Sequence, residues 1–163
     1  MANESSSIHS PPAKPPQLKL VAGLQCRIGR ARVAIPIEAV ARIIEYQVVR
    51  LPLARPWIGG LGIHEGAPLL SVALVMPEGK GAPTSSAKGI LLNVPGSPIG
   101  WALEIHEVFA FVRATVLPRR DQAGGDQLPR WITGANIEDG TSLGWIDVGD
   151  MVIDLTQSLD GRP

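Results

Sequence analysis

The 163-residue sequence has a single cysteine, few aromatic residues and no net charge. One cysteine, Cys26, excludes an internal disulfide framework and a cysteine-rich zinc site, and it favours a reducing compartment. Aromatic residues make up 4% of the chain, so Val, Ile, Leu and Ala must form most of its core. Because Lys and Arg total 15 and Asp and Glu total 15, no overall charge draws the chain toward nucleic acid or an anionic membrane.

The sequence also lacks the apolar segments that target or anchor a protein. Residues 1–17 are rich in Ser and Pro, and Glu4 stands where a signal peptide would have basic and then apolar residues. No stretch approaches the roughly 18 apolar residues of a membrane-spanning helix. Hydrophobic residues nevertheless make up 45% of the chain, which is ordinary for a globular domain. We expect a soluble cytoplasmic domain preceded by a disordered tail over residues 1–17.

What the sequence does contain is an internal repeat. Residues 57–66, Trp-Ile-Gly-Gly-Leu-Gly-Ile-His-Glu-Gly, return at residues 131–140 as Trp-Ile-Thr-Gly-Ala-Asn-Ile-Glu-Asp-Gly. Trp, Ile, Gly, Ile, an acidic residue and a final Gly keep the same offsets, which indicates a duplication. In each copy, the acidic residue followed by Gly predicts a type I′ turn that joins two strands.

Each half of the chain begins with another predicted hairpin. Alternating apolar residues predict paired strands over 18–28 and 32–36, and again over 90–94 and 99–105. The repeat halves therefore cover about 18–76 and 89–155 of a single domain, 18–156. Loops are predicted at 77–88 and 118–130, and a frayed C-terminus at 157–163. Many short, evenly spaced strands favour small β-barrels over a layered α/β domain.

One short helix is predicted over residues 37–46. Branched apolar residues recur there with a period near 3.6, at Ile37, Val40, Ile43 and Ile44. Glu38 and Arg42 would lie on its outer face, four residues apart, as a solvated ion pair. Residues 150–155 could form either a helical turn or a last strand.

The sequence nominates no catalytic or metal-binding set. His64-Glu65 and His106-Glu107 lack the second histidine of a zincin helix, and no phosphate loop or nucleophile elbow occurs. Three acidic residues near the C-terminus lack calcium-loop spacing, at Asp147, Asp150 and Asp154. We expect no enzymatic activity, no cofactor and no metal; an enzyme in which the two His-Glu pairs converge is the third-ranked function.

The alternative function is a small-barrel nucleic-acid-binding protein. Arginines cluster at a hairpin tip and around the second loop, at Arg27, Arg30, Arg32, Arg113, Arg119, Arg120 and Arg130. Small barrels bind single strands through such tips combined with exposed aromatic rings. Against this, the chain is neutral, and core packing explains the repeated Trp residues better.

The order of these features resembles the CheW-like domain family. In the first half the resemblance rests on Ala34-Ile35-Pro36-Ile37-x-x-Val40, on Tyr46, on Pro56-Trp57-Ile58-x-Gly60 and on the Gly66 turn. In the second half it rests on Ile99-Gly100-Trp101-x-Leu103-x-x-x-x-Val108, Ile137-x-x-Gly140 and Trp145-Ile146-Asp147-Val148. The resemblance spans about Leu18 to Leu155, and the order and spacing of the motifs carry it.

This resemblance implies an all-β fold of two SH3-like five-stranded β-barrels packed together. It also implies a non-catalytic adaptor that couples a CheA-type histidine kinase to chemoreceptors in a bacterial signalling array. The implied partners are the CheW-like regulatory domain of the kinase, bound end to end, and the cytoplasmic tip of a methyl-accepting chemoreceptor, bound in the groove between the barrels. The implied location is cytoplasmic, with recruitment to membrane-associated receptor arrays but no membrane insertion.

The resemblance also implies a partner-binding surface, made of Glu38, Val40, Arg42, His64, Glu65 and Gly66. The family usually has Asn-Leu-Arg-Gly at the first turn, whereas this chain has Ile63-His64-Glu65-Gly66. A positive charge has therefore become negative, and a reversed charge at the rim of an interface changes which partner is tolerated. We expect a divergent member that serves a dedicated receptor, a twitching-motility system or another alternative pathway.

Overall fold

The computed structural model describes residues 18–51, 57–74, 84–118 and 129–160. These residues form ten strands, one 3-10 turn, η1 (Ile37–Ala39), and one helix, α1 (Val148–Leu159). The strands are β1 (Leu20–Ile28), β2 (Ala31–Pro36), β3 (Val40–Val49), β4 (Ile58–His64), β5 (Ala67–Val72), β6 (Thr84–Leu92), β7 (Gly100–Glu104), β8 (Glu107–Val116), β9 (Ile132–Ile137) and β10 (Ser142–Ile146).

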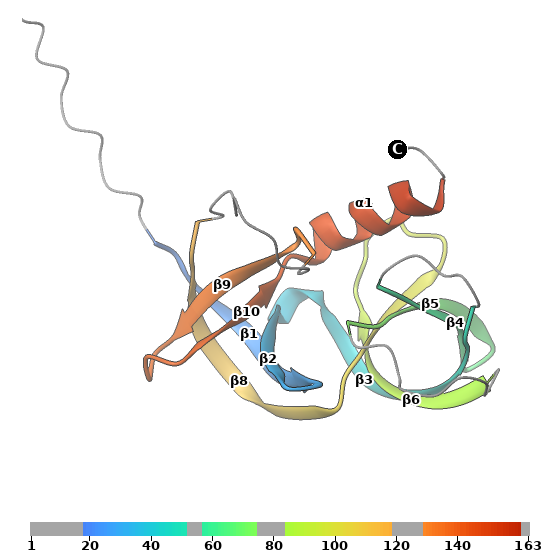
Figure 1. The fold of residues 1–163 in the computed structure, drawn as a ribbon, viewed down its shortest axis with the longest axis horizontal. Helices are drawn as coiled ribbons and strands as arrows, with labels where there is room; N and C mark the ends of the chain where they lie inside the picture. The colour runs from blue at the N-terminus through green and yellow to red at the C-terminus, as the bar shows by residue number, and fades with distance from the viewer. Residues whose placement is uncertain (1–17, 52–56, 75–83, 119–128, 161–163) are drawn as a thin grey trace, which may run out of the picture.

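The strands close into two five-stranded barrels that lie side by side (Figure 1). Barrel 1 has the order β1-β2-β10-β9-β8, and barrel 2 has the order β3-β4-β5-β7-β6. Neighbouring strands are antiparallel except for one parallel pair in each barrel, β2 with β10 and β5 with β7. The predicted fold of two small barrels with a single helix is confirmed.

The two barrels are not the two sequence repeats, because the halves of the chain exchange hairpins. β1 and β2 from the first half close barrel 1 together with β8, β9 and β10 from the second half. In return, β6 and β7 close barrel 2 together with β3, β4 and β5. Equivalent positions of the duplication pair with each other in both barrels. Val33 lies opposite Gly144 in the parallel pair of barrel 1, and Trp101 lies opposite Leu70 in that of barrel 2. The chain therefore forms one interlocked unit.

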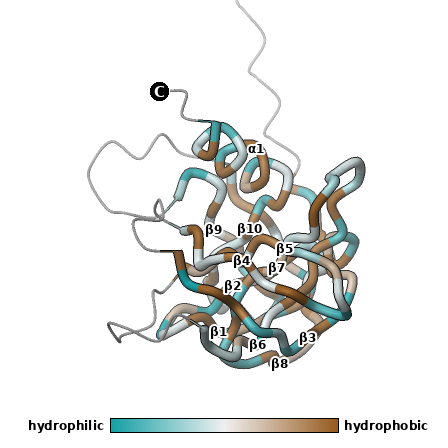
Figure 2. Tube along the Cα trace, turned by 90° about the vertical axis from the view of Figure 1, so that its right-hand side faces the viewer, coloured by the Kyte–Doolittle hydropathy of each residue, from teal (hydrophilic) through white to brown (hydrophobic). Residues whose placement is uncertain are grey.

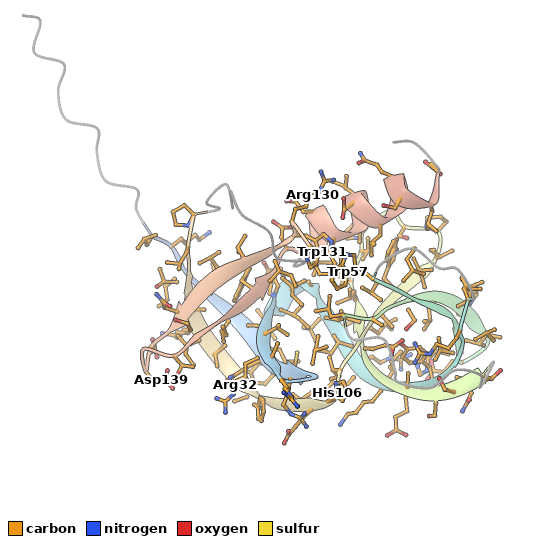
Figure 3. The ribbon with its side chains drawn as sticks, in the orientation of Figure 1. Arg32, Trp57, His106, Arg130, Trp131 and Asp139 are labelled. Carbon is orange, nitrogen blue, oxygen red and sulfur yellow. The ribbon has the colours of Figure 1, made fainter. Side chains whose placement is uncertain are left out.

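The main core lies between the barrels. Its buried side chains come from both barrels and from α1, whereas smaller apolar clusters fill each barrel interior. Trp57 and Trp131, from the repeated motif, meet edge to face in this region, with ring centroids 6.5 Å apart and planes at 81° (Figure 3). Several strands are consequently buried on both faces, which explains the nearly continuous apolar run at residues 69–73. Figure 2 shows hydrophobic and hydrophilic stretches alternating along the rest of the trace.

The helix predicted over residues 37–46 is wrong. Only Ile37–Ala39 form a helical turn, and the following residues form β3, in which alternate residues from Ile44 to Val48 are buried. Its many β-branched residues suit a strand that has a partner on each side. A bulge between Val40 and Arg42 interrupts the period of two at the start of β3, and this irregular spacing resembled a helical stripe.

The helix lies at the C-terminus instead. Asp147 caps α1 by accepting a hydrogen bond from the backbone N–H of Asp150 at 3.0 Å. Val148, Met151 and Leu155 bury one face of α1 in the core between the barrels. The segment at 150–155, which the sequence left open, is therefore helical.

The predicted loops are only partly described. The loop expected at 77–88 is too long, because β6 begins at Thr84. The rest of it lies in 75–83, which is outside the described residues, as are 1–17, 52–56, 119–128 and 161–163. In the described part of the chain, α1 is too short and too polar to cross a membrane.

Candidate interaction surface

The turn between β4 and β5 carries three of the residues selected from the sequence. Glu65 and Gly66 both have positive φ, of 49° and 79°, so the type I′ turn predicted here is confirmed. In the second copy only Gly140 has positive φ, and Asp139 does not, so the type I′ turn predicted there is wrong. Gly66 adopts this conformation without strain, whereas Glu65 is one of two described non-glycine residues with positive φ. The turn holds the Glu65 side chain out on the surface of barrel 2, where it is 65% exposed.

Glu65 pairs with Arg42 at the start of β3. Arg42 Nη2 donates to Oε2 at 2.6 Å, and Arg42 Nη1 donates to Oε1 at 3.3 Å. This two-pronged hydrogen bond, and then the positive charge of Arg42, lower the pKa of the Glu65 carboxyl below its usual value. His64 contributes less, with Nε2 at 3.7 Å from Oε1. Because the Arg42 side chain is 51% exposed, a docking protein could contact both charges.

The structure separates Glu38 and Val40 from this pair. The ion pair predicted between Glu38 and Arg42 is wrong, because η1 and β3 replace the helix and turn Arg42 toward Glu65. Val40 is half-buried against the core between the barrels. Glu38 lines a cleft between the barrels, and its carbonyl accepts a hydrogen bond from Asn93 Nδ2 at 3.5 Å.

Exposed apolar side chains lie on the two strands that lead to the Arg42–Glu65 pair, β3 and β4. Ile63 precedes His64 and is 63% exposed. Leu61 and Val49 are exposed as well, and they lie opposite each other on β4 and β3. An apolar surface beside a charged rim has the composition of a protein-interaction site.

The cleft between the barrels is a second candidate binding region. Glu38 and Ala39 of η1 form one side, and the β6–β7 turn around Pro95 contributes another. The first residues of α1 and four residues of barrel 1 also line it, the latter being Val21, Pro36, Val116 and Trp145. Glu38 and Asp147 are the acidic residues of this lining, which is apolar elsewhere except at Asn93.

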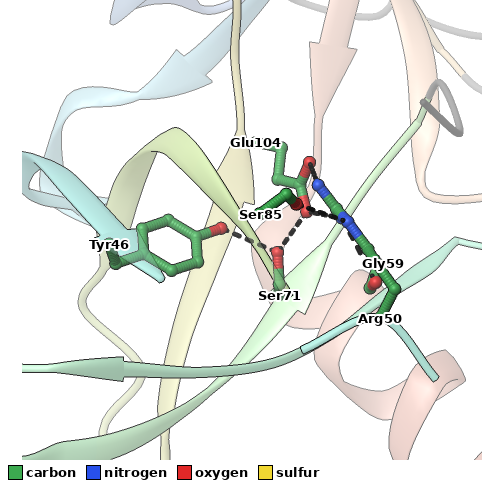
Figure 4. A network of polar contacts seen from close by, with 6 residues as sticks. All are labelled: Tyr46, Arg50, Gly59, Ser71, Ser85 and Glu104. Carbon is green, nitrogen blue, oxygen red and sulfur yellow. Dashed lines mark hydrogen bonds and ion pairs between the residues drawn. The ribbon is translucent and has the colours of Figure 1, made fainter. Parts of the chain in front are cut away.

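Sequence reasoning missed a polar network inside barrel 2 (Figure 4). Arg50 binds both carboxylate oxygens of Glu104, and its Nη1 also donates to the carbonyl of Gly59 at 3.2 Å. Ser71 donates to Glu104 Oε1 and is 2.7 Å from the hydroxyl of Tyr46. The side chains of Arg50 and Glu104 are only 18% and 15% exposed. In the sequence, the only sign of this network was Ser71, a polar residue within the apolar run at 69–76.

Three of the residues considered for catalysis or metal binding have structural partners: His106, Glu107 and Asp154. His106 Nδ1 accepts a hydrogen bond from the backbone N–H of Gly29 at 3.0 Å, and Glu107 pairs with Arg27 at 3.2 Å. Asp154 pairs with Arg130 at 2.8 Å. Among the described residues, no group of three or more His, Cys, Asp or Glu could hold a metal ion.

A family model identifies the family of the chain, and a solved structure supports its fold. A model of the CheW-like domain family matches residues 22–155. Among solved structures, the chain is similar to the scaffolding protein TtCheW from Thermoanaerobacter tengcongensis, with a TM-score of 0.54 and 14% identity over 79% of this chain and 90% of that chain. No curated protein matches the sequence significantly. At this level of identity the structural match supports the fold alone.

Proposed function

The chain belongs to the CheW-like domain family, and from this premise we propose that it is a non-catalytic scaffold of a bacterial chemosensory array. It joins a CheA-type histidine kinase to chemoreceptors, and it works in the cytoplasm at membrane-associated arrays. The observation that carries this proposal is the exposed Arg42–Glu65 pair beside Ile63 on barrel 2. A surface that combines apolar contact with fixed charges serves recognition between proteins.

The two candidate regions suit two partners. The CheW-like regulatory domain of the kinase docks on barrel 2, where Val49, Leu61 and Ile63 supply exposed apolar area. The receptor tip binds the cleft between the barrels, where Glu38 and Asp147 select basic or hydrogen-bond-donating side chains. A scaffold needs both partners bound together, and separate surfaces allow this.

The polarity of the Arg42–Glu65 pair sets which partner is accepted. Glu65 stands at the tip of the turn, so an approaching surface first meets a negative charge. A partner with a basic residue at this point gains a favourable contact, whereas an acidic one is repelled. We assign this chain to a dedicated pathway, such as twitching motility, whose kinase or receptor carries the matching charge.

The test measures binding of each variant to the immobilised CheW-like regulatory domain of the kinase from the same genome. Glu65→Arg should weaken binding about tenfold or more, because it reverses the charge at the rim. It also leaves Arg42 facing another arginine, so the double variant Arg42→Glu/Glu65→Arg is needed. This double variant restores the ion pair with reversed polarity, and it should remain weak if polarity determines recognition.

A matched control reverses an exposed acid on barrel 1, which also belongs to a surface ion pair. Glu107→Arg should bind as the wild type does. If wild-type protein binds neither a CheW-like regulatory domain nor a receptor tip, the scaffold proposal fails. Oligonucleotide binding that falls steeply with salt would favour the nucleic-acid alternative instead.

A further inference from the structure

Both phenylalanines of the chain lie on the outside of barrel 1, on β8. Phe111 is 75% exposed and Phe109 is 41% exposed. Phe109 is partly covered by Arg32, whose guanidinium carbon is 5.2 Å from the ring centroid. Among the described residues, no cation stacks on Phe111. A large ring this exposed costs free energy in water, which indicates an interaction surface.

A groove runs beside Phe111, between β8 and the β9–β10 turn. Ala22, Val112 and Ile137 supply apolar lining. Arg113 of β8 lines one side, and Glu138 and Asp139 of the β9–β10 turn line the other. Figure 3 shows Asp139 at the tip of this turn. Neither Arg113 nor Glu138 forms an ion pair with another described residue. The groove therefore has an apolar middle, one positive side and one negative side.

We propose that this groove binds the same groove of a second copy of the chain, which produces a two-fold symmetric dimer. In such an interface each surface must be complementary to itself, so a residue i that contacts j is matched by j contacting i. Here Arg113 of each copy meets Glu138 and Asp139 of the other, and the two Phe111 rings meet near the axis. A partner with one uniform charge would satisfy only one side of the groove.

The pairing of β8 differs between its two edges. β1 pairs with it from Glu107 to Thr115, whereas β9 pairs only with Ala114–Val116. The proposed contact uses the side chains that line the groove. Exposed Leu20 on β1 extends the apolar area beside Ala22, but the surface is small beside the roughly 800 Å² that each partner of a stable complex buries. The dimer is therefore a weak, concentration-dependent one. It does not depend on the scaffold function, which uses barrel 2 and the cleft.

The test follows the mass of the full-length chain by sedimentation velocity from about 1 µM to about 1 mM, the range in which weak complexes dissociate. The wild type should shift from monomer to dimer across this range. Phe111→Ser should abolish the shift. Ile153→Ser, at an apolar residue exposed on α1, is the matched control and should not change it.

Charge reversal distinguishes this dimer from any other. Arg113→Glu alone and Glu138→Arg alone should each remain monomeric, because both contacts across the axis then place like charges together. An equimolar mixture of the two variants should dimerise. In the mixed dimer, the introduced acid of one copy faces the introduced base of the other, while the second contact keeps its native charges. Circular dichroism confirms that both variants are folded. A wild type that stays monomeric, single variants that still dimerise, or a mixture that does not pair would overturn the proposal.

Discussion

The Glu104 carboxyl group lies inside barrel 2, where its side chain is only 15% exposed. Arg50 and Ser71 hold both carboxylate oxygens, and Arg50 is held in turn by Gly59 and Ser85. The equivalent residue of barrel 1 is Pro36, because Pro36 pairs with Gly23 as Glu104 pairs with Gly89. The duplication therefore preserved the backbone while one interior became polar.

Removal of the Glu104 carboxylate should destabilise the protein. Glu104→Ala leaves the Arg50 guanidinium largely buried without its counter-ion. Losing one partner of a buried pair costs about 3–5 kcal/mol, and we expect about 2–3 kcal/mol here because the pair is partly exposed. Urea unfolding measures the change. Glu107→Ala, which removes the surface pair with Arg27, is the matched control and should cost at most about 1 kcal/mol. Equal costs for the two variants would contradict a structural role for the network.

Tyr46 is the only tyrosine, so its ionisation can be followed directly. Burial raises its pKa from 10.0 to about 12, against a smaller opposite effect of the Ser71 hydrogen bond. The folded protein therefore keeps a proton that the unfolded chain releases, and stability should fall as pH rises from about 10 to 12. The absorbance of tyrosinate should appear only near pH 12 in the folded state. Titration near pH 10 before unfolding would contradict the buried position.

Cys26 acts in the same direction and must be separated from Tyr46. Burial raises the pKa of its thiol from 9.0 to about 12. The contribution of Cys26 to the stability of the folded state therefore also falls as pH rises. In a Cys26→Ala background, the remaining loss of stability above pH 10 should disappear on Tyr46→Phe. Unfolding curves at several pH values provide the measurement.

At the scale of the strands, one glycine in each barrel makes room for an aromatic ring: Gly23 for Trp145 in barrel 1, and Gly89 for Tyr46 in barrel 2. A Cβ on Gly23 would lie 2.9 Å from Cζ3 of Trp145, and a Cβ on Gly89 would lie 2.9 Å from the carbonyl oxygen of Leu103 and 3.0 Å from Cε1 of Tyr46. The two glycines occupy equivalent positions, opposite Pro36 and Glu104. Each barrel thus packs one aromatic ring against a bare stretch of backbone.

Gly89→Ala should therefore destabilise barrel 2. The close contact with a backbone oxygen cannot be relieved by a side-chain rotation, and overpacking of this kind costs about 1–3 kcal/mol. Gly134→Ala is the matched control, because its Cβ meets only the end of the Leu117 side chain, at 3.3 Å. Thermal unfolding of both variants tests the difference. A Gly89→Ala protein as stable as the control would show that the strands adjust freely.

The sequence predicted elements that depend on local chemistry. The hairpins and the type I′ turn at Glu65-Gly66 follow from alternation and from the conformational freedom of glycine. The helix at 37–46 was wrong because a bulge distorted the local period. The Arg42–Glu65 pair and the Arg50–Glu104 network could not be predicted, because each joins residues brought together only by the closure of barrel 2.

At the scale of the whole molecule, the exchange of hairpins determines how the chain can fold. Neither repeat contains a complete barrel: the first half has β1 to β5, and the second half has β6 to β10 and α1. An isolated half would leave a two-stranded hairpin without its partners, and such a hairpin is marginally stable at best. It would also expose its half of the core between the barrels, including either Trp57 or Trp131.

The two halves should therefore fold only together. Fragments 1–79 and 80–163, separated between β5 and β6, should each lack a cooperative unfolding transition. When mixed, they should form a one-to-one complex with the circular dichroism spectrum of the intact chain, because every missing strand of one fragment is supplied by the other.

An intact chain with a protease site at the same position, cut after folding, is the control for the break itself. If that control keeps its structure and one fragment alone still unfolds cooperatively, the repeats are independent units and the exchanged strands do not determine stability. If only the mixture folds, the two barrels form a single cooperative unit, so a partner that binds barrel 2 also stabilises barrel 1.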